Sequence, residues 1–163
     1  MSLIAVAVND VLCSKSWRVN EAGRNLVLGF LEFSRVVLLL DHGDVDRFKM
    51  WARLEGIRGY VDVVPDTVPT ALRGYDLRTG QVEYLEGRGT AVDLLIDNDP
   101  DRVAAAMKNG INCLLFCDAK FQRGEFRPDF EGEYRSWDDL KAEIEHQHLL
   151  STDLADAENS AQH

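Results

Sequence analysis

The sequence predicts an α/β fold: a doubly wound, mainly parallel sheet of about five strands with a β-hairpin insertion and a C-terminal helix. Short apolar runs recur along the chain, and segments with helical periodicity separate most of them. Runs that are apolar throughout are typical of parallel strands, which helices cover on both faces. The predicted strands are residues 3–9, 36–40, 60–64, 92–96 and 111–116.

Helices are predicted where a capping residue precedes apolar positions spaced three or four apart. Asn20 opens the helix predicted over residues 20–34, and Asp44 opens the next one. Asp99 lies just before Pro100, which suits the first turn of a helix. Ser136 begins a capping-box pattern and therefore predicts the last helix.

Residues 75–85 show a different sequence pattern from the predicted strands and helices. Polar and apolar residues alternate on both sides of Thr79 and Gly80, and this pattern predicts a β-hairpin.

The length of 163 residues suits one domain, and 45% hydrophobic residues indicate a globular chain. We expect a single Rossmann-like domain over residues 1–150. Residues 151–163 are small and polar, with three carboxylates and no lysine or arginine, so they predict an acidic flexible tail.

Charge, hydropathy and cysteine content predict the kinds of partner and the cellular compartment of the protein. A net charge of −10 disfavours nucleic-acid binding, because an acidic surface repels phosphates. No apolar run reaches the roughly 18 residues that span a bilayer, and the apolar N-terminus lacks the basic flank of a signal peptide. Cys13, Cys113 and Cys117 form an odd, unpatterned set, which favours free thiols in the cytoplasm.

Three motifs include or follow the ends of predicted strands, where ligands bind in such folds. They are Ile4 to Leu12, Val68-Pro69-Thr70-Ala71, and Leu94-Leu95-Ile96-Asp97-Asn98-Asp99-Pro100. Spread over roughly residues 3–117, they resemble the motifs of the haloacid dehalogenase (HAD) superfamily, in particular those of its small, capless, phosphatase-like members.

The resemblance implies a set of catalytic positions: a nucleophilic aspartate, an acid-base aspartate, a hydroxyl, a lysine, and paired acids that hold magnesium. In this chain these positions hold, in that order, Ala7, Asn9, Leu40 or Asp41, Val68, and Asp97 with Asp99. Alanine cannot form a phospho-aspartate and asparagine cannot shuttle a proton. We therefore expect a HAD-like domain with no catalytic residues and no cofactor.

Two alternatives keep a chemical role for the strand ends. A divergent Mg-dependent phosphohydrolase would need a relocated set, such as Asp10 as nucleophile or His42 as base. A metal or small-ligand sensor would use the acidic crevice, with a magnesium site formed by Asp97, Asp99 and Asn9. The competing interpretation is that Asp99 only caps its helix and Asp10 only tightens a turn.

Without a catalytic set, the expected function is binding to another protein, with no nucleic-acid or membrane partner. Residues 121–137 are rich in aromatic residues and arginine, which dominate interface hot spots, although this segment could instead pack along a sheet edge. The resemblance is to phage or bacterial members, which suggests a phage or bacterial cytoplasmic protein. The predicted interaction residues are Tyr75, Tyr84, Phe121, Phe126, Phe130 and Tyr134.

Overall fold

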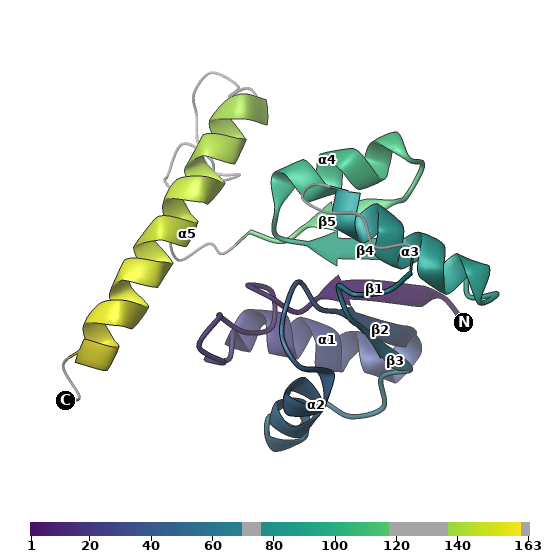
Figure 1. Cartoon of the computed structure of the whole chain (residues 1–163), viewed down its shortest axis with the longest axis horizontal. Helices are drawn as coiled ribbons and strands as arrows, with labels where there is room; N and C mark the ends of the chain where they lie inside the picture. Colours follow the sequence, from purple (N-terminus) through teal and green to yellow (C-terminus); the bar gives the residue numbers. More distant parts are fainter. Residues whose placement is uncertain (70–75, 118–136, 161–163) are drawn as a thin grey trace. The chain divides into compact units, whose positions relative to one another are not determined.

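Five parallel strands form one sheet in the order β3-β2-β1-β4-β5 (Figure 1). A computed structural model describes residues 1–69, 76–117 and 137–160 of the chain. The α/β, doubly wound prediction is confirmed, because the chain runs from β1 outward to β3 and then returns to the other side of β1. The strands are β1 (Leu3–Ala7), β2 (Arg35–Leu39), β3 (Asp62–Val64), β4 (Leu94–Asp97) and β5 (Cys113–Leu115).

Helices follow the strands, and the predicted caps open three of them. The side chains of Asn20, Asp44 and Asp99 each accept hydrogen bonds from two backbone amides in the first turn. Among the helices of the described residues, none combines the length and apolarity needed to cross a bilayer. The helices are α1 (Glu21–Phe33), α2 (Val45–Leu54), α3 (Leu77–Gly87), α4 (Pro100–Lys108) and α5 (Trp137–Ser160).

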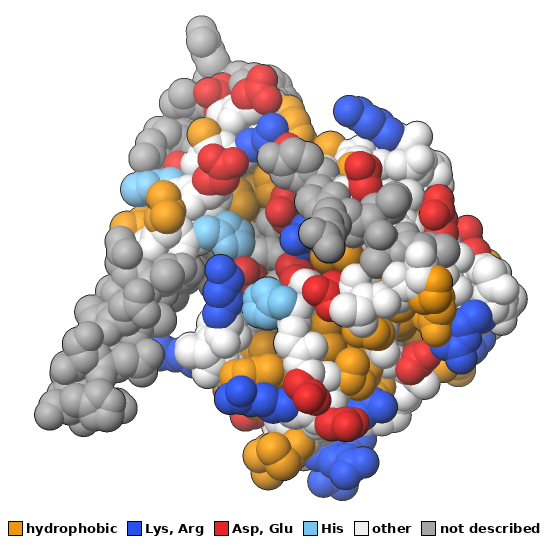
Figure 2. Space-filling model, viewed as in Figure 1, with side chains coloured by type: hydrophobic (Ala, Val, Ile, Leu, Met, Phe, Trp, Pro, Cys, Tyr) orange, Lys and Arg blue, Asp and Glu red, His pale blue; other side chains and the backbone are white. Residues whose placement is uncertain are grey.

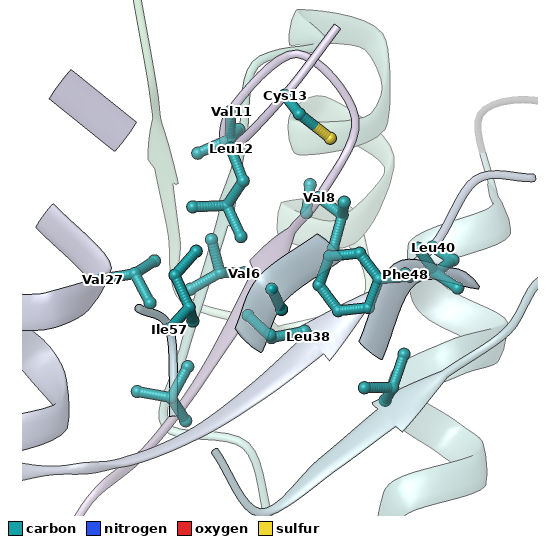
Figure 3. Close-up of a cluster of buried hydrophobic side chains, with 14 of the residues drawn as sticks. Val6, Val8, Val11, Leu12, Cys13, Val27, Leu38, Leu40, Phe48 and Ile57 are labelled. Carbon is teal, nitrogen blue, oxygen red and sulfur yellow. The ribbon is translucent and has the colours of Figure 1, made fainter. Parts of the chain in front are cut away.

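Each face of the sheet has its own buried cluster, since successive side chains of a strand point to opposite faces. Ile4 and Val6 of β1 pack with residues of α1 and α2, such as Val27 and Phe48 (Figure 3). On the other face, β1 packs with side chains of α3 and α4. The strands therefore read as continuous apolar runs because both faces are covered.

The connection from β1 to α1 is folded back against α1. The backbone amide of Asn20 donates to the carbonyl of Leu12 at 2.7 Å. Gly23 lies so close to this loop that a Cβ added to it would be 1.7 Å from the carbonyl oxygen of Val11. The absence of a side chain at Gly23 thus allows the loop to dock, and the docked loop fixes the residues that follow β1.

The prediction of a β-hairpin over residues 75–85 is wrong. Residues 77–87 form helix α3, with Thr79 and Gly80 inside it, although both residues are weak helix formers. The helix is determined by its tertiary contacts, because Arg78 and Gln81 are fully buried and hydrogen-bonded at the sheet. Local alternation around a Thr-Gly pair carried no information about these long-range bonds.

The contacts within the chain divide it into two compact units, Met1–Phe116 and Cys117–His163. The expectation of a single domain over residues 1–150 stays a prediction. Helix α5 includes residues 151–160, which were expected to belong to the acidic tail.

Replacing Gly23 with alanine should destabilise the protein strongly, because the new methyl group would collide with the backbone of the β1–α1 loop. We expect the free energy of unfolding to fall by about 3 kcal/mol, measured by urea denaturation. Gly29→Ala in the same helix is the matched control. Its Cβ would meet nothing within 4 Å, so it should raise stability by about 0.5–1 kcal/mol. Equal effects of the two substitutions would contradict the docked loop.

Candidate functional site

The acidic crevice expected at the carboxyl ends of β1, β2 and β4 is occupied by an arginine. Arg78, from the first turn of α3, has a side chain that is 0% exposed. Its Nε donates to Asp97 at the end of β4, and its Nη2 donates to Asp41, which follows β2. Since β2 and β4 flank β1 in the sheet, the guanidinium bridges them across the end of the central strand.

Gln81 holds the arginine in this position from the next turn of α3. Its side-chain oxygen accepts from Nη1 of Arg78 at 2.9 Å. Its amide nitrogen lies 2.8 Å from the carbonyl oxygen of Leu40 and 3.2 Å from those of Val64 and Pro65. The backbone carbonyls at the ends of β2 and β3 therefore fix Gln81, and Gln81 fixes the guanidinium.

A second arginine extends the network to the start of α4. Nη1 of Arg102 donates to Asp41, and its Nε lies 3.6 Å from Asp99 Oδ2. Asp99 uses its other oxygen to cap α4, at 2.9 Å from the amide of Asp101. Three carboxylates and two guanidinium groups thus form one chain of contacts around the crevice.

Burial and charge act in opposite directions on Arg78. Burial alone would lower its pKa, but the neighbouring carboxylates of Asp97 and Asp41 outweigh burial and raise the pKa above its ordinary value. The guanidinium therefore stays charged, and it neutralises carboxylates that have little access to water.

The carboxylates of the expected magnesium site have protein partners. Asp97 is fully buried; one oxygen accepts from Arg78 and the other accepts from the amide of Asp99 at 2.8 Å. The Oδ1 of Asn9 accepts from the amide of Asp41 at 3.0 Å. Within the described part of the chain, no group of three or more His, Cys, Asp or Glu side chains is arranged to hold a metal ion.

Two further positions implied by the HAD resemblance, Ala7 and Val68, carry no polar side chain. Ala7 is buried at the end of β1 and ends in a methyl group. Val68, at the expected lysine position, is 6% exposed and belongs to the apolar cluster on the α3 and α4 face. The cation of this crevice comes instead from Arg78.

Sequence reasoning missed Arg78, Gln81 and Arg102. A usable signal was present: carboxylates that follow β2 and β4 in a buried crevice require a cation nearby. Arg78 and Gln81 are three residues apart, as polar residues on one helical face are, between apolar Leu77 and Val82. Reading the segment as a strand concealed this spacing.

The remaining predicted residues lie elsewhere or outside the described residues. The imidazole Nε2 of His42 is 3.4 Å from Nδ2 of Asn9, at the edge of the crevice, and His42 is exposed. Asp10 has a positive φ of 63°, as a residue in a tight turn does. Tyr84 is half-buried, with the guanidinium of Arg88 5.4 Å from its ring centroid. The other expected interaction residues, Tyr75, Phe121, Phe126, Phe130 and Tyr134, are not among the described residues.

Comparison of the chain with models of protein families and with curated proteins finds no match.

Replacing Arg78 with methionine should lower the free energy of unfolding by about 3–5 kcal/mol, because it leaves the buried Asp97 carboxylate without an ion-pair partner and removes one of the two arginines that bind Asp41. Arg88→Met is the control, since the ion pair of Arg88 with Asp62 is exposed and should contribute at most about 1 kcal/mol. Urea denaturation measures both. Asp97→Asn should lower the free energy of unfolding less when it is introduced into the Arg78→Met variant than when it is introduced into the intact protein. Additive effects would show that the pair is not coupled.

Proposed function

We propose that this protein is a catalytically inactive, HAD-like domain that acts by binding another protein. The observation that carries the proposal is the buried guanidinium of Arg78, which bridges Asp41 and Asp97 at the crevice. In a working phosphatase of the type that the chain resembles, this region would hold a magnesium ion and a phosphoryl group.

Magnesium binding would require the network to be dismantled. Magnesium prefers near-octahedral oxygen ligands at about 2.0–2.1 Å, and both oxygens of Asp97 already accept hydrogen bonds. Freeing the Asp97 carboxylate would leave the buried charge of Arg78 with one of its two carboxylate partners, which is unfavourable by several kcal/mol. The absence of a carboxylate at positions 7 and 9 adds a chemical obstacle to this energetic one.

Protein binding is supported by surface features away from the crevice. Phe33 and Leu54, at the ends of α1 and α2, are 76% and 81% exposed. Because the strands are parallel, the connecting helices run antiparallel to them. The C-terminal ends of α1 and α2 therefore both lie at the amino edge of the sheet. The sequence of residues 121–137, rich in aromatic residues and arginine, is a second candidate binding segment, proposed from composition alone. If the chain is phage-encoded, as the resemblance suggests, the partner would be a bacterial host protein.

The protein should release no phosphate from p-nitrophenyl phosphate above the buffer rate, with or without millimolar magnesium. Magnesium should also leave the melting temperature of the protein unchanged. A ligand that binds only the folded state would raise the melting temperature, and we expect no magnesium to bind. Asp97→Asn, checked for folding by circular dichroism, is the matched variant. Magnesium-dependent release by the intact protein that is lost in folded Asp97→Asn would establish an enzyme and exclude the proposal.

A pull-down from bacterial lysate should recover a specific partner with the intact chain and lose it when residues 121–137 are deleted. A Phe33→Ser, Leu54→Ser double variant tests the second surface, and Arg53→Ser with Arg58→Ser is its control at nearby exposed positions. Retention of the partner by a folded deletion variant assigns binding to the Phe33 and Leu54 surface if the double variant loses it. Retention by every variant would exclude both surfaces.

A further inference from the structure

A cavity of about 240 Å³ opens at the carboxyl ends of β1 and β2, beside the crevice that Arg78 fills. Its walls come from the β1–α1 loop, from the residues after β2, and from the start of α2. Asn9 belongs to both regions, since it lines the cavity and accepts from the amide of Asp41. Neither Arg78 nor Arg102 lines the cavity, so the two regions differ in their side chains.

The charge of the cavity is opposite in sign to that of the chain as a whole. Lys15 and Arg47 line it, in a protein of net charge −10. Among the described residues, neither cation forms an ion pair, and Asp44 is the one carboxylate in the lining. Asp44 Oδ1 already accepts from the amides of Asp46 and Arg47, at 2.7 and 3.0 Å. On the face of Met1–Phe116 that Figure 2 presents, acidic and basic side chains are interspersed.

Trp17 provides a rigid aromatic wall. Its φ of 65° is rare for a bulky residue, and such a conformation persists only where its surroundings enforce it. Nε1 of Trp51 donates to the carbonyl of Trp17 at 2.9 Å, and the guanidinium of Arg47 lies 5.5 Å from the centroid of the Trp17 ring. The indole and one of the two cations are thus held together before any ligand arrives.

Size and lining together indicate the ligand. The volume is below the roughly 300–1,000 Å³ of pockets for drug-sized molecules, so a compact molecule fits. Two cations, an imidazole and the side-chain amide of Asn9 suit an anionic group, while Trp17 and Leu40 suit an apolar part. We propose that this cavity binds a compact organic anion, with its carboxylate or phosphate group at Lys15 and Arg47 and a small ring against Trp17.

This proposal does not rest on the absence of catalysis or on a protein partner. It uses neither the Arg78 network nor the segment 121–137. Ligand binding can therefore fail while the proposed function holds, and the proposed function can fail while ligand binding holds.

The test is a titration of the full chain with benzoate, phenyl phosphate and inorganic phosphate, at an ionic strength held constant with sodium chloride. We expect saturable quenching of tryptophan fluorescence and a rise in melting temperature with at least one of the two ring-bearing anions. The comparison of benzoate with phenyl phosphate distinguishes a carboxylate from a phosphate ligand. Benzamide, the neutral counterpart of benzoate, should produce neither effect.

Variants locate the site. Lys15→Gln should raise the Kd at least about tenfold, because it removes a charged hydrogen-bond donor, and Trp17→Phe should abolish most of the quenching. Lys49→Gln is the control: it makes the same charge change on α2, outside the cavity lining, and should leave the Kd unchanged. The proposal is overturned if no ring-bearing anion saturates, if benzamide binds equally well, or if Lys49→Gln weakens binding as much as Lys15→Gln does.

Discussion

The ion pairs of Arg78 with Asp41 and Asp97 are the contacts on which the rest of this structure depends. The sheet consists of two halves that meet where β1 pairs with β4. Asp41 belongs to one half and Asp97 to the other, so a single buried guanidinium joins them at their carboxyl ends. Buried ion pairs add little net stability compared with apolar packing, but removing one partner is strongly unfavourable. Loss of Arg78 alone should therefore destabilise the junction of the two halves by more than the intact pairs stabilise it.

Closure of the crevice changes where function should be sought in a doubly wound fold. Ligands of such folds bind at the carboxyl ends of strands, next to the point where the strand order reverses. Here that point is filled by the protein's own side chains, and the cavity lies one strand further along, between the β1–α1 loop and α2. The docking of that loop on Gly23 keeps this neighbouring region in a defined shape.

Local sequence signals predicted most of the fold. The apolar runs gave the five strands, and Asn20, Asp44 and Asp99 gave the starts of three helices, since these signals involve residues close in sequence. The prediction of α3 failed because its helical state depends on bonds from Arg78 and Gln81 to residues 16 to 41 positions away. The site could be predicted only in part, because its contacts are also long-range. The absence of a carboxylate at positions 7 and 9 could be read directly from the sequence, but the arginine that fills the crevice could not.

The contacts of α3 also bear on the order in which the protein folds. Its first turns contain Thr79 and Gly80, which are weak helix formers, and its Asp76 cap makes no side-chain hydrogen bond, so the isolated segment should have low helicity. The partners of Arg78 and Gln81 exist only once β2, β3 and β4 lie side by side. We therefore expect helix α3 to form late, and its amide protection to report the assembly of β2, β3 and β4, unlike that of a helix that forms autonomously.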